Sequence, residues 1–128
     1  MTVAYFDSSA IVKLERLERE SLALIDYLNA GAVEASTSVV ASVEVFRALK
    51  RTMPAPPGEP MRGFFLLNLD AAICAAASHL ESTTLRSLDA IHLATALSID
   101  DEIEVITYDE RLAAAAREHQ LRVVQPGR

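Results

Sequence analysis

Short apolar runs alternate along this chain with longer segments in which apolar side chains recur every three or four residues. The short runs predict buried β-strands, and the longer segments predict helices. The predicted strands span residues 3–6, 35–38, 64–69, 104–107 and 121–124. The predicted helices span residues 17–29, 40–51, 71–79, 85–99 and 110–118. Strands that alternate with helices indicate a doubly wound α/β fold, in which helices cover both faces of a parallel sheet.

The spacing of apolar residues within each predicted helix indicates which side faces the core. Gly31 is placed to end the helix 17–29. The proline-rich segment 53–60, MPAPPGEP, suits neither a helix nor a central strand, so we expect a loop inside the domain. The apolar positions at helical spacing are Leu22, Ile25 and Leu28; Val40, Val43, Phe46 and Leu49; and Leu88, Ile91 and Thr95.

Length and composition narrow the class of protein. A chain of 128 residues, 51% hydrophobic, suits a single domain spanning residues 1–128. Cys74 is the only cysteine, which excludes an internal disulfide and fits a reducing compartment, and we expect it to be a small core residue. The N-terminus lacks the basic segment of a signal peptide, and the aliphatic stretch 71–77 is too short to cross a membrane. We therefore expect a soluble, cytoplasmic protein with no membrane partner.

The charge balance constrains how this chain could bind nucleic acid. The formal net charge is −6, and the basic residues form only local clusters. Binding that rests on charge attraction alone usually requires a strongly basic face. A divalent cation could offset the acidic residues at a phosphate. The clusters are Arg47, Lys50 and Arg51, and Arg111, Arg117 and Arg122.

Two acidic residues follow predicted strands. In AYFDSSAIV, Asp7 comes directly after the strand 3–6, and in VITYDERL, Asp109 comes just past the fourth strand. Each could cap the helix that follows it, because aspartate accepts hydrogen bonds from the first amides of a helix. Ligands of doubly wound folds bind at the carboxyl ends of the strands, so two acids at this edge also favour a site.

Two further acids lie inside predicted helices, where capping does not explain them. Glu44 is flanked by valines in a mostly apolar helix, and Asp89 borders the apolar stripe of the helix 85–99. Glu44 could pair with Arg47 on a solvated face, and Asp89 could bond His92 or Arg86 one turn away. Aspartate is a poor helix former, which favours a functional reason for its presence.

The order of these motifs resembles a known family. FDSSAIVK, the helix that contains Glu44, LDAIHLATAL and TYDERL together resemble a PIN domain, and more narrowly a VapC-type toxin ribonuclease. The resemblance implies a PIN-like three-layer α/β/α sandwich with a central parallel sheet, and metal-dependent cleavage of RNA. It implies a homodimer and a cognate antitoxin protein as partners. It places the acidic positions of the site at Asp7, Glu44, Asp89 and Asp109, with Ser8 and Thr107 in support.

The chemistry of these acids can also be argued directly. Four carboxylates without a required Cys or His form a hard oxygen site, which suits Mg²⁺ or Mn²⁺. Two unit charges about 4 Å apart repel by roughly 4 kcal/mol at an effective dielectric constant near 20, so the cluster needs cations or shifted pKa values. We assign Asp7 and Asp89 as core metal ligands, and Glu44 and Asp109 as ligands directly or through water.

Other interpretations remain. His92, three residues after Asp89, could be a general base, but packing or a local hydrogen bond is the expected role, because a metal-bound hydroxide needs no histidine. A receiver-like Mg²⁺-binding signalling domain would need two adjacent acids near the first strand and a lysine at a late strand end, and neither is present. A catalytically idle PIN-fold interaction module would be expected to lack one or more of the acids.

Overall fold

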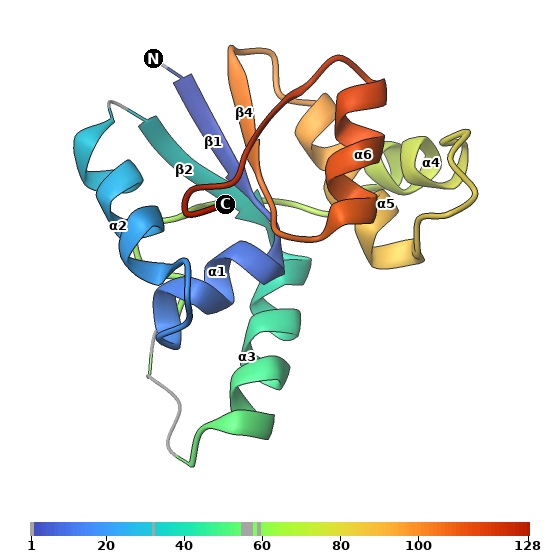
Figure 1. The fold of residues 1–128 in the computed structure, drawn as a ribbon. Coiled ribbons are helices and arrows are strands. Elements are labelled where there is room, and N and C mark those ends of the chain that lie inside the picture. Colours follow the sequence, from blue (N-terminus) through green and yellow to red (C-terminus); the bar gives the residue numbers. More distant parts are fainter. Residues whose placement is uncertain (1, 32, 55–57, 59) are drawn as a thin grey trace.

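The computed structural model describes residues 2–31, 33–54, 58 and 60–128, and these residues form one parallel sheet of five strands (Figure 1). The strand order is β3-β2-β1-β4-β5. Strand β1 lies in the middle, with Tyr5 opposite Ser36 of β2 and Val105 of β4. The strands are β1 (Thr2–Phe6), β2 (Val33–Ser38), β3 (Phe65–Leu67), β4 (Ile103–Ile106) and β5 (Arg122–Val124).

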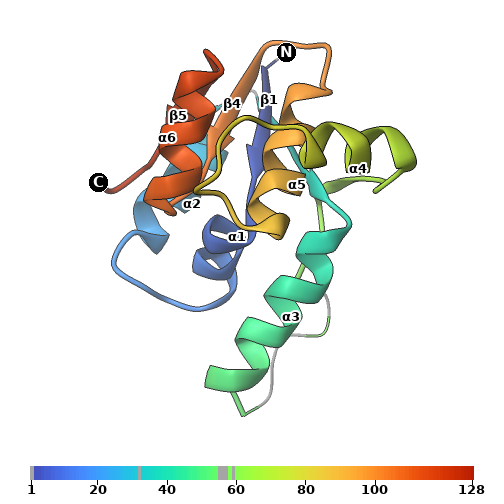
Figure 2. The same ribbon diagram turned by 90° about the vertical axis from the view of Figure 1, so that its right-hand side faces the viewer.

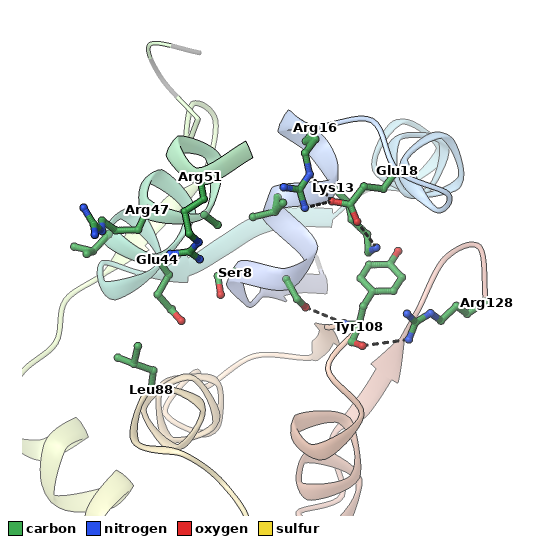
Figure 3. A pocket seen from close by; sticks show the side chains of 14 residues that line it. Ser8, Lys13, Arg16, Glu18, Glu44, Arg47, Arg51, Leu88, Tyr108 and Arg128 are labelled. Carbon is green, nitrogen blue, oxygen red and sulfur yellow. Dashed lines mark hydrogen bonds and ion pairs between the residues drawn. The ribbon is translucent and has the colours of Figure 1, made fainter. Parts of the chain in front are cut away.

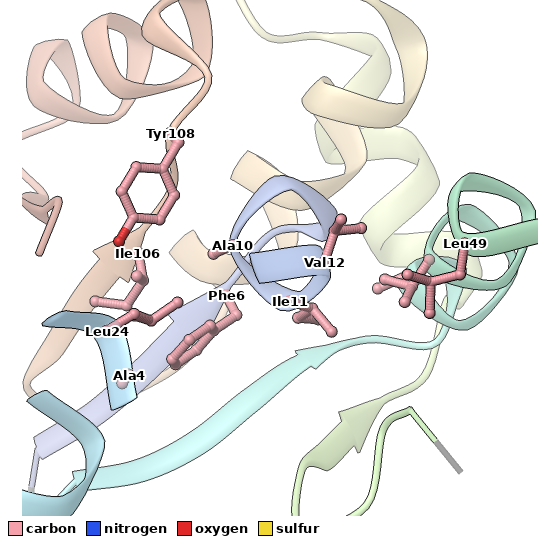
Figure 4. Close-up of a cluster of buried hydrophobic side chains, with 11 residues drawn as sticks. Ala4, Phe6, Ala10, Ile11, Val12, Leu24, Leu49, Ile106 and Tyr108 are labelled. Carbon is pink, nitrogen blue, oxygen red and sulfur yellow. The ribbon is translucent and has the colours of Figure 1, made fainter. Parts of the chain in front are cut away.

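Helices cover both faces of this sheet. Residues alternate between the faces along a strand, and β1 shows which helices lie on each side. Ala4 and Phe6 pack in one core cluster with residues of α1, α2 and α3, which Figure 4 shows. Tyr5 packs in a second cluster with residues of α5 and α6. The three-layer α/β/α sandwich is therefore confirmed. The helices are α1 (Ser8–Glu15), α2 (Ser21–Ala30), α3 (Val40–Thr52), α4 (Ala71–Ser78), α5 (Ser87–Leu97) and α6 (Glu110–Glu118).

Helix α1 is missing from the sequence prediction, and α2 begins later than predicted. Asp7 caps α1 by accepting a hydrogen bond from the Ala10 amide at 3.1 Å. The Ser21 hydroxyl accepts the Glu18 amide at 2.8 Å, which holds a turn before α2. Leu17 is 79% exposed and lies outside the helix. The local hydrogen bonds of Ser21 therefore replace the predicted first turn. Gly31 ends α2 as predicted.

The face of α2 that packs on the sheet also differs from the prediction. Leu24 is fully buried, whereas Leu22 and Ile25 are exposed. Leu28 is half-buried and packs against the first core cluster. The spacing pattern identified the helix but not the side that it buries.

The predicted inward face of α3 is also partly wrong. Leu49 is buried, as expected, but Val43 is 64% exposed and Phe46 is 40% exposed. Ala41 and Val45 take their places in the core. These two and Leu49 follow one another at intervals of four residues, so small and medium side chains form the contact face. Figures 1 and 2 show α3 extending beyond the carboxyl end of the sheet, where much of its surface meets no other element.

Helix α5 buries a continuous segment rather than the predicted stripe of residues. Thr95 is buried as expected, but Leu88 is 45% exposed and Ile91 is only half-buried. The continuous stretch from His92 to Ala96 is buried, because α5 contacts β2, α4 and α6. Cys74 on α4 is exposed rather than part of the core, since α4 packs mainly on α5 and leaves most of its alanine surface free.

The predicted loop 53–60 is only partly described. Residues 53, 54, 58 and 60 lie outside helices and strands, and residues 55–57 and 59 lie outside the described residues. Within the parts of the chain that the structure describes, no helix has both the length and the apolar character needed to cross a membrane.

Candidate active site

The sheet topology creates a crevice at the carboxyl ends of β1 and β4. From β1 the chain moves outward through β2 to β3, whereas β4 and β5 lie on the other side of β1. The order therefore reverses between β1 and β4, and doubly wound folds bind ligands at such a point. Asp7 follows β1, and Thr107 and Asp109 follow β4. The two acids predicted at strand ends thus lie at the same switch point.

Asp7 is the most buried of the four acids, with 3% of its surface exposed. One carboxylate oxygen accepts hydrogen bonds from the Ser9 hydroxyl at 2.7 Å and from the Ala10 amide at 3.1 Å. The other oxygen accepts the Thr107 hydroxyl at 2.7 Å. Burial raises the pKa of Asp7, and the three hydrogen bonds and the nearby His92 oppose that rise. Asp7 is therefore both the N-cap of α1 and a carboxylate that hydrogen bonds hold in one orientation in the crevice.

Thr107 joins the two strand-end acids. Its hydroxyl donates to Asp7 and accepts the Asp109 amide at 3.1 Å, and the residue is fully buried. Asp109 caps α6, with one carboxylate oxygen accepting the amides of Arg111 and Leu112 at 2.9 and 3.0 Å. The capping interpretation of Asp7 and of Asp109 is confirmed, and capping does not remove either from the crevice.

Ser9, rather than Ser8, is the serine that holds Asp7. The Ser9 hydroxyl bonds Asp7 and accepts the Tyr108 amide at 3.0 Å, so it links α1 to the segment after β4. Ser8 is half-buried and lines the pocket described below. No sequence signal separates Ser9 from Ser8, because both serines directly follow Asp7 within the same short stretch.

Glu44 is held from behind by a buried chain of hydrogen bonds. The Tyr5 hydroxyl lies 2.7 Å from His92 Nδ1, and His92 Nε2 lies 2.7 Å from Glu44 Oε1. Burial, followed by the charge of Asp7, raises the pKa of Tyr5, so the hydroxyl keeps its proton. Because a carboxylate only accepts hydrogen bonds, Nε2–H of His92 is the donor to Glu44. Glu44 therefore pairs with His92 and not with Arg47.

The contacts of His92 favour a positioning role over a general base. The ring is 1% exposed, and both nitrogens are engaged. Its partners come from β1 and α3, so the expectation of a local bond within α5 is wrong. Burial in the core and hydrogen bonding of the ring are otherwise as expected.

Asp89 has a different environment from the other acids. It lies in the first turn of α5, is half-buried, and forms no hydrogen bond with His92 or Arg86 among the described residues. Burial raises the pKa of Asp89, the charges of Asp109 and Glu44 raise it further, and His92 and Arg86 oppose them. Asp89 is thus a carboxylate crowded by like charges, and these charges disfavour its ionised form.

One pocket of about 450 Å³ collects all four acids. Among the described residues, no three His, Cys, Asp or Glu side chains are close enough to enclose a metal ion as they stand. The donor set still fits Mg²⁺ or Mn²⁺, because Mg²⁺ usually keeps several waters and takes only one or two protein carboxylates. Arg86, which the sequence interpretation did not include in the site, also lines the pocket. The lining residues are Asp7, Ser8, Ser9, Glu44, Arg86, Ser87, Leu88, Asp89 and Asp109.

Comparisons with known proteins agree with this geometry. The family model of the PIN domain matches residues 4–118. Ribonuclease VapC35 of Mycobacterium tuberculosis is 40% identical over 96% of both chains, and Ribonuclease VapC47 of the same species is 36% identical over the same shares. A solved toxin–antitoxin complex from Klebsiella pneumoniae contains a chain that is 25% identical, with a TM-score of 0.70 over 96% of this chain and 97% of that one.

Proposed function

The chain belongs to the PIN-domain family and to its VapC-type branch, and from this premise we propose that it is a metal-dependent endoribonuclease and the toxin of a toxin–antitoxin pair. The observation that carries the proposal is the gathering of Asp7, Glu44, Asp89 and Asp109 in one pocket at the switch point of the sheet. The acids come from four separate segments, so their meeting is a property of the fold and not of one motif.

We assign Asp7 and Asp89 as the residues that would hold Mg²⁺ or Mn²⁺, with Glu44 and Asp109 contributing directly or through water. A bound divalent cation would polarise the scissile phosphate, lower the pKa of water and neutralise the leaving oxygen. This also answers the charge problem of an acidic protein that acts on RNA, because the cation supplies the positive charge at the phosphate.

The protein's own contribution is to orient these carboxylates before the substrate binds. Three hydrogen bonds orient the Asp7 carboxylate, and the bond from His92 orients that of Glu44. The amides of α6 hold one oxygen of Asp109. Carboxylates that are already oriented need little reorganisation during the reaction. Such preorganisation is how an active site lowers an activation barrier electrostatically. Thr107 and Ser9 support this arrangement by connecting β1, α1 and the segment after β4.

The direct test is cleavage of a structured RNA by the purified protein. Cleavage should require Mg²⁺ or Mn²⁺ and should stop when EDTA is added. Cleavage that continues undiminished in EDTA would exclude the metal mechanism. A protein that binds Mn²⁺ and RNA but cleaves no RNA would favour an idle interaction module instead.

We further propose a cognate antitoxin protein and a second copy of this chain as partners, acting in the cytoplasm. The similarity to a chain of a toxin–antitoxin complex supports the first, and exposed apolar side chains such as Val43 and Phe46 leave surface for either. Expression of the chain alone should arrest growth, and co-expression of the neighbouring small gene product should relieve the arrest. A protein that is harmless and monomeric in analytical ultracentrifugation would count against both partners.

A further inference from the structure

A second pocket adjoins the acidic one and is lined by basic side chains. Its volume is about 660 Å³, and α1 and α3 form its two walls (Figure 3). Ser8, Ser9, Glu44 and Leu88 line both pockets, so the two adjoin along these residues. We call this second pocket the basic groove. Its cations are Lys13, Arg16, Arg47, Arg51 and Arg128.

Most of these cations already have acidic partners. Lys13 pairs with Glu18 and Glu20, and Arg16 pairs with Glu18, at distances of 2.7 to 3.0 Å. Arg128 pairs with Glu20 as well, and with Glu110, both at 3.0 Å. These pairs hold α1, α2 and the last residues of the chain together, which is a structural role.

Arg47 and Arg51 differ from the other cations of the basic groove. Both are exposed, and neither forms an ion pair or a side-chain hydrogen bond with any residue that the structure describes. They are therefore the uncompensated positive charge in the groove. Exposed arginines without partners can also be ordinary solvated residues, so their position relative to the acids decides the interpretation.

That position is set by the geometry of α3. Arg47 and Arg51 follow Glu44 by three and seven residues, and residues at such spacing share one side of a helix. A rise of 1.5 Å per residue places them about 4.5 and 10.5 Å beyond Glu44 along the helix axis. Figure 3 shows Arg51 reaching back along α3 toward Glu44. Lys50 lies on the same helix but does not line the groove.

We propose that Arg47 and Arg51 form a phosphate track that binds the RNA backbone beside the scissile position. This inference rests on the proposed function and adds where the substrate lies. A nuclease with a net charge of −6 must hold a polyanion next to four carboxylates. Guanidinium groups bind phosphate through paired N–H donors, and backbone contacts of this kind set the register of a strand. An RNA strand bound along α3 runs from the basic groove into the acidic pocket past Glu44, which lines both.

Binding of a fluorescent single-stranded RNA in EDTA tests the track without cleavage. Anisotropy titrations at several salt concentrations would compare wild type with Arg47→Gln, Arg51→Gln and the double variant. The slope of log K against log salt is negative, and each lost phosphate contact should reduce its magnitude by about 0.7. The double variant should reduce the magnitude by about 1.4. We expect the double variant to bind about tenfold more weakly at low salt. Lys50→Gln is the matched control, because it removes one charge from the same helix outside the groove.

A second measurement separates binding from chemistry. With Mn²⁺ present, the two arginine variants should raise KM and change kcat little, because a remote phosphate contact stabilises substrate and transition state alike. Thermal melts of all variants should match wild type, since these side chains are exposed and form no ion pair with the described residues.

The outcomes discriminate between the possible failures. Suppose that wild type binds and cleaves RNA. If the arginine variants then bind RNA as well as wild type does, or if Lys50→Gln weakens binding equally, the track is wrong and the proposed function stands. A wild type that neither binds nor cleaves RNA overturns the proposed function and the track with it. A parallel titration with a fluorescent polyglutamate peptide tests whether the basic groove binds an acidic protein segment instead of RNA. If the arginine variants lose only peptide binding, the groove binds an acidic protein segment and the track is wrong.

Discussion

Asp89 is the residue at which a structural and a functional role can best be separated. Its carboxylate forms no hydrogen bond with the described residues, and burial raises its pKa, as do the charges of Asp109 and Glu44. An ion-pair partner would stabilise the fold, whereas a crowded acid destabilises the protein without metal. We predict that Asp89→Asn abolishes RNA cleavage and leaves the melting temperature in EDTA unchanged or higher. Mg²⁺ or Mn²⁺ should stabilise wild type by mass action and the variant much less.

The pH dependence of this effect has a defined sign. The pKa of Asp89 in the folded protein lies above its ordinary value of 3.8, so the folded state holds that proton more tightly than the unfolded state. Its contribution to stability is full below about pH 3.8 and is lost as the pH rises through the raised pKa. The advantage of Asp89→Asn should therefore grow with pH in thermal melts. Asp26→Asn, an exposed acid on α2, is the control and should change neither cleavage nor melting. A variant that still cleaves RNA, or that melts several degrees lower in EDTA, would refute the assignment.

His92 offers the opposite case, a residue whose structural contacts are complete. His92→Ala would leave the Tyr5 hydroxyl and one Glu44 oxygen without their partner and would open a buried cavity. We expect a loss of about 3 kcal/mol in the free energy of unfolding, measured by urea denaturation. Cleavage should fall as Glu44 loses its orientation, and His92→Gln should restore part of it because its amide can still donate to Glu44. His79→Ala is the control, since His79 is exposed and bonds only a carbonyl of its own helix. An activity unchanged in His92→Ala would exclude the positioning role.

At the scale of elements, helix caps connect the fold to the site. Asp109 caps α6 and lines the acidic pocket, so its replacement mixes two effects. Asp109→Ala should cost about 1 kcal/mol of stability through the lost cap, whereas Asp109→Ser should keep most of the cap. Both should impair cleavage if the carboxylate is needed. Guanidinium denaturation and an RNA cleavage assay measure the two effects separately.

Asp70 supplies a matched control for that prediction. It caps α4 by accepting the amide three residues on, that of Ile73, at 2.8 Å, as Asp109 accepts that of Leu112, but it lies outside the acidic pocket. Asp70→Ala should lose similar stability and keep full cleavage. If Asp109→Ser cleaves RNA as well as wild type does, Asp109 is a cap and nothing more.

The sequence could predict the order of the strands and helices, but not the face that each helix buries. Strand and helix order follow from the apolar pattern, and α6 matches its predicted span of residues 110–118. The inward face of α3 was not predictable, because Val43 and Phe46 are larger and more apolar than the buried Ala41. Only tertiary packing decides which of two apolar stripes meets the sheet.

In the candidate site, the sequence could identify the acids but not the side chains that hold them. The four acids were identifiable from motif order and do line one pocket, while their catalytic and metal-binding roles stay a prediction. The partner of Glu44 was not identifiable, because His92 lies 48 residues away in the sequence. Ser9 was overlooked in favour of Ser8, since both follow Asp7 and only the fold decides which hydroxyl turns back to the carboxylate. Long-range hydrogen bonds leave no periodic trace in a sequence.

At the scale of the whole molecule, charged groups join the beginning and end of the described chain. Glu20 is buried and accepts hydrogen bonds from Lys13 at 2.9 Å and from Arg128 at 3.0 Å. The cations of Lys13 and Arg128 also lie 4.8 and 5.4 Å from the centre of the Tyr108 ring. This cluster ties α1, the turn before α2, the segment after β4 and the final residues together, and its Lys13, Tyr108 and Arg128 line the basic groove.

The last prediction concerns the pH dependence of this cluster. The hydrogen bond from Lys13, together with that from Arg128, lowers the pKa of Glu20 from 4.5 to about 2, so the folded state favours the ionised form. The resulting stability is fully present above pH 4.5 and is lost as the pH falls toward 2. Glu20→Gln should therefore melt below wild type at pH 6, and the difference should shrink between pH 4.5 and 2. Glu81→Gln, which changes an exposed acid outside this cluster, is the control. A gap between wild type and Glu20→Gln that is constant from pH 6 to pH 2 would mean that packing, not charge, gives Glu20 its role. A gap that closes on acidification would show that ion pairs hold the wall of the groove in place.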